Sequence, residues 1–269
     1  MKSTISARVG IAAAAIGIAF AVGPLSANHS WGNYHWARTA NPFTLAVGDN
    51  VSSAWDSYLN TAISEWSTSI VLNLVKVTDG TRPRNCKART GRIEVCSDTY
   101  GNTGWLGVAR ISVSGSHITA ATTKVNDTYF NTSTYNTTPW RRLVMCQEVG
   151  HDFGLDHQDE NFSNPNLGTC MDYTNDPDGG GSYGPSNVQP NGHDYDQLIR
   201  IYSHVDSTST VGSFSAVSPQ DKENEPENWG QLIRSSRNGR VHLYELDFGN
   251  GRRIFTHVFW ADPVGDSRR

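Results

Sequence analysis

The sequence predicts an α+β fold with a small β-rich extension, and three stretches carry this prediction. Between residues 51 and 67, apolar side chains recur at helical spacing with polar residues between them, as in a helix that packs one face on a sheet. Residues 70–77 then form a short apolar run that is typical of a buried strand. Near the end of the chain, residues 241–248 and 254–260 flank a Gly-Asn-Gly turn, which is the pattern of a β-hairpin.

Three regions follow one another along the chain. Residues 1–27 have the features of a secretory signal peptide: positive charges, an apolar run at 9–22 and a small-residue cleavage site. That run is too short and too weakly apolar to favour a membrane span. Residues 28–206 are expected to form the main domain, and residues 207–269 a polar linker and the hairpin extension, which is either a small accessory module or a flap on the main domain. The protein is therefore predicted to be secreted.

Composition and charge exclude some classes of partner. The formal net charge is −4 and charged residues make up 18% of the chain, so neither nucleic acid nor a membrane is an expected partner. The 11 prolines and 25 glycines, with abundant Ser, Thr and Asn, suit a loop-rich exported protein.

Four cysteines in an exported chain predict two disulfide bonds, although three pairings are possible. Cys86 and Cys96 flank a short polar segment that could close as a hairpin, and this local bridge is the favoured one. The remaining pair, Cys146 and Cys170, would then be joined across a longer stretch of chain.

The middle of the chain supplies further strands and two helices. Residues 93–96, 104–111 and 117–125 are strand candidates. Thr138-Pro139, a capping hydroxyl followed by proline, predicts the start of a helix, and residues 191–204 resume helical periodicity.

Chemistry is concentrated in the helix that begins at residue 138. Gln147 and His151 are four residues apart and share one face, so their side chains can converge on one metal ion. Glu148 can reach a water molecule on that ion without being a ligand. Gly154 lets the helix stop in a left-handed cap, and the chain can then return with His157. Three donors and an adjacent carboxylate are the layout of hydrolytic zinc.

This segment resembles the H-E-x-x-H-x-x-G-x-x-H signature of the metzincin metallopeptidases, with Gln147 where the family has its first histidine. The run at 168–173, which contains Met171, is similar to the methionine turn of that clan. The resemblance implies a matrixin-like catalytic domain: a mixed twisted sheet, an active-site helix, the Met-turn and a C-terminal helix. In matrixins the strand equivalent to 104–111 lies at the sheet edge and pairs with substrate, although an ordinary glycine-interrupted strand fits this sequence equally well.

By the same resemblance, the protein is a secreted zinc-dependent metalloendopeptidase that cleaves polypeptides. Gln147, His151 and His157 would be the zinc ligands, Glu148 the general base, and Tyr173 a ligand or an oxyanion donor. The alternative is a catalytically inactive protein of the same fold that binds peptide or protein in the cleft. Calcium in the acidic loop after Tyr173 is possible, but no regular ligand spacing supports it.

Gln147 is the departure from the family pattern, because a carboxamide oxygen is a weaker zinc donor than imidazole nitrogen. Either Gln147 binds through its oxygen, or another side chain takes its place, or the site holds no metal. The candidates for a replacement are Asp152, Asp156 and His193, none of which has motif support.

Overall fold

The computed structural model describes residues 29–78, 80–180, 183–212, 226–236 and 239–261. The predicted signal peptide, residues 1–27, lies outside these ranges, as does much of the predicted linker. The elements in chain order are β1 (His35–Trp36), β2 (Phe43–Asn50), α1 (Asp56–Trp66), β3 (Leu72–Val77), β4 (Arg92–Asp98), β5 (Trp105–Ser114), β6 (His117–Asn126), α2 (Asp127–Phe130), α3 (Thr138–His151), α4 (Gly192–Ile201), a 3-10 turn (Pro226–Asn228), β7 (Gln231–Ser235), β8 (Val241–Asp247) and β9 (Arg252–Trp260).

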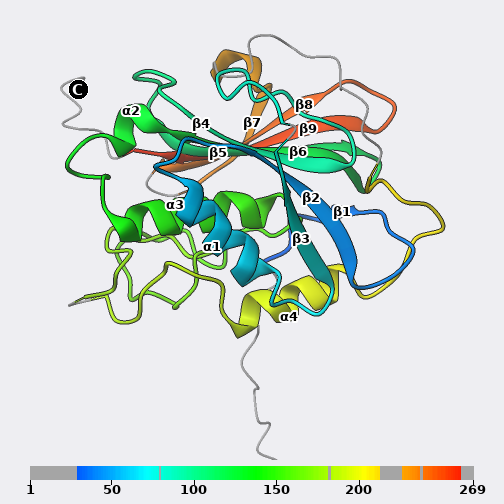
Figure 1. Cartoon of the computed structure of the whole chain (residues 1–269), viewed down its shortest axis with the longest axis horizontal. Helices are drawn as coiled ribbons and strands as arrows, with labels where there is room; N and C mark the ends of the chain where they lie inside the picture. Colours follow the sequence, from blue (N-terminus) through cyan, green and yellow to red (C-terminus); the bar gives the residue numbers. More distant parts are fainter. Residues whose placement is uncertain (1–28, 79, 181–182, 213–225, 237–238, 262–269) are drawn as a thin grey trace, which may run out of the picture.

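One mixed nine-stranded sheet organises the molecule, with helices α1, α3 and α4 beneath it in Figure 1. The strand order is β3-β2-β4-β6-β5-β9-β8-β7, and the short β1 pairs with the start of β6. Strands β3, β2, β4 and β6 run parallel to one another, whereas β5, β9, β8 and β7 follow as antiparallel neighbours. The α+β class and the mixed sheet expected from the sequence are therefore present.

The main core lies between the helices and the sheet, and indoles connect it to α3. The Trp66 indole nitrogen donates to the Cys146 carbonyl within α3, and that of Trp36 donates to the Asp152 carbonyl just beyond it, at 3.0 and 2.9 Å. A smaller cluster packs together Tyr100, Trp105, Val108, Trp229 and Val258. Two fully buried tryptophans thus hold α3 through hydrogen bonds, one within the helix and one just beyond its end.

The C-terminal hairpin is an integral part of the sheet, since β9 pairs along β5 from Trp105↔Trp260 to Ser114↔Arg252. Strand β5 is consequently an internal strand, and the alternative that placed residues 104–111 at a free substrate-binding edge is wrong. The reason is a pairing between strands far apart in sequence, which the pattern of residues 104–111 by itself does not disclose.

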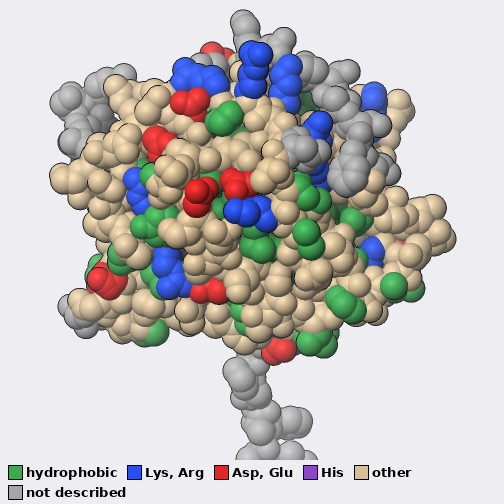
Figure 2. Space-filling view, viewed as in Figure 1, with side chains coloured by type: hydrophobic (Ala, Val, Ile, Leu, Met, Phe, Trp, Pro, Cys, Tyr) green, Lys and Arg blue, Asp and Glu red, His purple; other side chains and the backbone are tan. Residues whose placement is uncertain are grey.

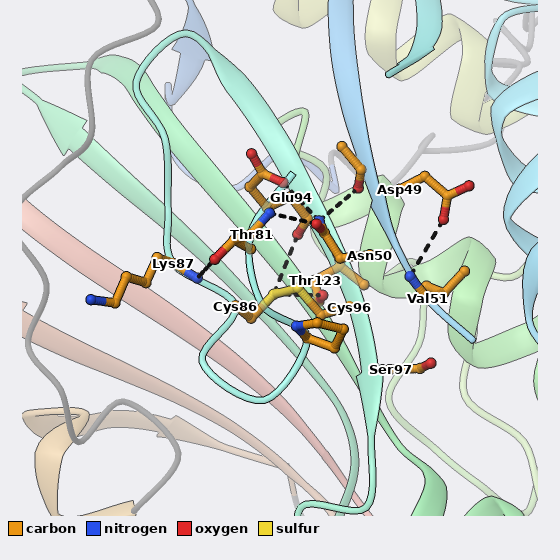
Figure 3. The surroundings of a disulfide bond; sticks show 12 residues. Asp49, Asn50, Val51, Thr81, Cys86, Lys87, Glu94, Cys96, Ser97 and Thr123 are labelled. Carbon is orange, nitrogen blue, oxygen red and sulfur yellow. Dashed lines mark hydrogen bonds between the residues drawn. A yellow bond between two sulfur atoms is a disulfide. The ribbon is translucent and has the colours of Figure 1, made fainter. Parts of the chain in front are cut away.

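Both expected disulfides are formed, Cys86–Cys96 and Cys146–Cys170. Figure 3 shows the first bridge beside a hydrogen-bonded corner, in which Asn50 donates to the Glu94 carboxylate at 2.7 Å and accepts from the Thr81 amide. This bridge closes the loop before β4 onto the strand. The second bridge joins α3 to the turn that contains Met171.

On the face seen in Figure 2, acidic and basic side chains are interspersed in a surface that is mainly uncharged, in keeping with the low charged fraction. Among the described residues, none of the helices has the length and apolar character needed to cross a membrane.

Candidate metal centre

Helix α3 delivers the motif residues to the interior. Thr137, one residue before the predicted cap, is the N-cap and its hydroxyl accepts from the Trp140 amide, so Thr138 is the first helical residue. At the other end, Gly154 has φ +90°, and a Cβ there would lie 2.2 Å from the Tyr34 carbonyl oxygen. Only glycine fits this reversal, which turns the chain so that His157 comes back toward His151.

His151 and His157 meet through their Nε2 atoms, which are 2.8 Å apart. On the far side of each ring, Nδ1 faces an oxygen: the Leu155 carbonyl at 2.8 Å from His151, and the Glu160 carboxylate at 3.0 Å from His157. These oxygens assign the ring proton to Nδ1 in both residues, so two Nε2 lone pairs point at each other. Facing lone pairs repel, and a shared cation removes that repulsion.

His257 of β9 completes the group, and the sequence analysis missed it. Its ring stacks on that of His151, with centroids 4.0 Å apart and 9° between the planes. One nitrogen from each of His151, His157 and His257 lies within 4.8 Å of the other two. Within the described chain neither ring nitrogen of His257 has a hydrogen-bond partner, and the Asp156 carboxylate is 3.8 Å from Nε2, too far to accept a hydrogen bond.

The surroundings of His151 and His257 favour the neutral imidazole, which is the form that binds metal ions. Burial lowers the pKa of His151 and of His257 well below the usual value, and the neighbouring imidazoles lower each pKa further. A proton shared within the cluster is therefore disfavoured. The orphaned nitrogens of His257 and the facing lone pairs fit a bound divalent cation such as zinc, for which three imidazoles are a familiar ligand set.

Gln147 is buried on the same helix, and its amide braces the Met-turn. Its Nε2 donates to the Cys170 carbonyl at 2.8 Å, while Oε1 has no hydrogen-bond partner among the described residues. The three side chains weighed as replacement ligands have other contacts: Asp152 accepts from Thr123, His193 stacks on His29, and Asp156 pairs with Arg234.

Glu148 and Tyr173 line the same interior region. Glu148 is buried against β5, where a Cβ at Gly107 would lie 2.6 Å from its Oε1. Burial, then the charge of Asp152, raises the pKa of Glu148 well above its usual value. The centroids of the Tyr173 and His157 rings are 4.4 Å apart. Burial raises the pKa of Tyr173 well above its usual value.

The Met-turn lies directly against α3. A Cβ added at Gly150 would be 2.7 Å from the Met171 sulfur, so the helix and the turn are as close as glycine permits. The Cys146–Cys170 disulfide fastens the same two segments. By contrast, the described part of the acidic loop that follows, residues 174–180, adds no residue to any group of side chains that could hold a metal ion.

The C-terminal strands cover the centre. Phe259 of β9 packs on Tyr173, with ring centroids 4.6 Å apart. Arg234 of β7 donates to both carboxylate oxygens of Asp156, at 2.6 and 2.5 Å, and lies 3.5 Å from Glu160. Every side chain of the histidine cluster is buried as a result, and the β5 edge is fully paired.

No protein-family profile matches the sequence, and no curated protein matches it. Among solved structures, the fold is similar to that of myroilysin, at 13% sequence identity and a TM-score of 0.37. The match covers 65% of this chain and 98% of the myroilysin chain.

Proposed function

We propose that the protein is a secreted zinc-dependent metalloendopeptidase whose zinc ligands are His151, His157 and His257. The observation that carries the proposal is the convergence of three buried imidazoles, two of them oriented by oxygen partners on Nδ1 and the third with no hydrogen-bond partner among the described residues. In this assignment His257 takes the place expected for Gln147. The two disulfides suit an extracellular, oxidising setting.

Bound zinc would supply Lewis acidity and bring the pKa of a water molecule toward 7. In its carboxylate form, which the raised pKa makes more basic, Glu148 would accept the proton of the attacking water and pass it to the leaving amine. The Tyr173 hydroxyl would donate a hydrogen bond to the oxyanion that develops on the peptide carbonyl. The substrate class is polypeptide.

A non-catalytic metal-binding protein of the same fold is the second candidate, and the closure of the site favours it. Strand β9 occupies the edge of β5 along which an extended peptide would otherwise pair, and Phe259 covers Tyr173. A peptidase with this site would need β7–β9 to shift before a polypeptide could reach Glu148.

Metal analysis and proteolysis together separate the two candidates. The full chain is purified without chelator, its zinc content is measured and compared with that of His257→Ala, and cleavage of a denatured protein is followed for wild type, Glu148→Ala and the control Glu245→Ala. Cleavage that is lost only in Glu148→Ala supports the peptidase. Zinc that is lost in His257→Ala, with no cleavage by any of the three, supports the binding protein. Zinc content that is unchanged by His257→Ala would overturn both.

A further inference from the structure

A second cluster of imidazoles shares no residue with the first and lies in a surface pocket. His35 of β1, His117 at the start of β6 and Asp206 in the segment after α4 offer ligand atoms that all lie within 4.8 Å of one another, and His204 lines the same pocket. The parallel pairing of β1 with β6 places His35 opposite His117. Three segments that are distant in sequence therefore bring three imidazoles and a carboxylate together.

The Asp206 carboxylate lies close to all three imidazoles, and His204 lies close to His35. Asp206 Oδ1 lies 3.5 Å from His35 Nε2, 3.2 Å from His117 Nε2 and 3.7 Å from His204 Nε2. The Nε2 atoms of His204 and His35 are 3.1 Å apart. Tetrahedral zinc with bonds of about 2.0–2.1 Å requires its donors to be about 3.3 Å apart, and these four distances bracket that value.

Neighbouring groups hold the donors in orientation. His35 Nδ1 donates to the Asn33 carbonyl at 2.8 Å, which leaves the Nε2 lone pair directed at Asp206. The other oxygen of Asp206, Oδ2, accepts from the Arg38 amide at 3.2 Å and from its guanidinium at 3.0 Å. Arg38 also donates to the His204 carbonyl. Arg38 thus orients the carboxylate and the segment that carries His204.

We propose that His35, His117, His204 and Asp206 form a second zinc site, with a structural role. Four protein donors fill the tetrahedron and leave no position for a substrate, as in structural zinc sites. The ion would join the N-terminal segment and the chain after α4 to the sheet at β6. The site is reachable from solvent, since His117 and His204 are 35% and 52% exposed at their side chains.

The test is zinc stoichiometry in the full chain after dialysis against zinc-free buffer, measured by mass spectrometry of the metal. His117→Ala/His204→Ala is the informative variant, because both side chains are partly exposed and their loss leaves the core intact. We expect it to bind one zinc ion fewer than wild type. The matched control is His242→Ala, a histidine of β8 that belongs to neither cluster.

A second readout is thermal. Zinc added to the chelator-treated protein should raise the melting temperature of the wild type and of His242→Ala by more than that of the double variant. Wild type binding two zinc ions and the double variant one would support both centres. Wild type binding one zinc ion and the double variant binding none would support this site and refute the His151 centre. Equal zinc content in wild type and double variant, with equal thermal shifts, would overturn the proposal.

Discussion

The imidazole of His257 lies flat on that of His151, with ring centroids 4.0 Å apart, and so joins strand β9 to helix α3 at the candidate metal centre. The contact makes the C-terminal strands part of the site, because the third imidazole is carried by the strand that covers it. Metal binding at this group would therefore be coupled to closure of the sheet over α3 through one residue.

Glu160 is expected to tune metal affinity without touching the metal, because its carboxylate accepts the Nδ1 proton of His157 at 3.0 Å. Glu160→Gln replaces the charge with a neutral amide. We expect zinc affinity at the His151 centre to fall by about 10–100-fold, measured by competition with a chromogenic chelator. Glu245→Gln, a change of the same kind on β8, is the control. Equal affinities in the two variants would contradict the assigned role.

Arg234 is expected to hold the C-terminal strands in place through its two hydrogen bonds to Asp156. Arg234→Met keeps much of the side-chain volume and removes both bonds. We expect the free energy of unfolding to fall by about 1.5–3 kcal/mol and amide exchange in β7 to β9 to accelerate. Arg253→Met is the control, because the carboxylates that pair with that arginine, Glu245 and Asp247, belong to its own hairpin, and its hydrogen bond to the Tyr34 hydroxyl does not involve Asp156. Unchanged amide exchange in β9 would show that Arg234 does not hold strands β7 to β9 in place.

Asp194 is expected to make stability depend on pH. Burial raises its pKa from 3.8 to about 6, against hydrogen bonds from Thr169 and the Asn191 amide. Between these values the native state holds a proton that the unfolded state has lost, so the unfolding free energy falls as pH rises from about 4 to 6. The slope contributed is at most about 1.4 kcal/mol per pH unit.

The variant Asp194→Asn keeps the side-chain shape and an acceptor oxygen but cannot ionise. Urea unfolding of both proteins between pH 4 and 7, with chelator present so that metal release does not contribute, isolates the effect. Wild type should lose more stability than the variant across this range. Identical slopes would mean that the Asp194 carboxyl titrates at its ordinary pKa.

Local patterns predicted much of the fold. Apolar periodicity located α1 and α4, and strands were predicted at the residues of β3 to β6. The spacing of Gly154 and His157 after His151 predicted the turn that brings the two histidines together. The Cys86–Cys96 and Cys146–Cys170 pairings are confirmed. The helices, strands and turn depend on residues that are near in sequence, and the disulfides had only three possible pairings.

What local patterns could not supply is the pairing of β9 with β5. A hairpin was predicted at the right residues, but its partner strand is set by non-local contacts, and the register decides which side chains face inward. A signal was present, because Phe255, His257 and Phe259 alternate along one face of β9. This alternation indicates that His257 lies in the interior. Only the register of β9 against β5 identifies the residues that His257 contacts.

The central claim, that His257 and not Gln147 supplies the third zinc ligand, is tested most directly by zinc affinity. His257→Ala and Gln147→Ala are compared in the His117→Ala/His204→Ala background, where the second cluster cannot contribute. We predict that His257→Ala releases zinc on dialysis, whereas Gln147→Ala retains one ion per chain and only loses the hydrogen bond to the Cys170 carbonyl. Retention of zinc by His257→Ala together with its loss from Gln147→Ala would contradict the assignment and return the third position to Gln147.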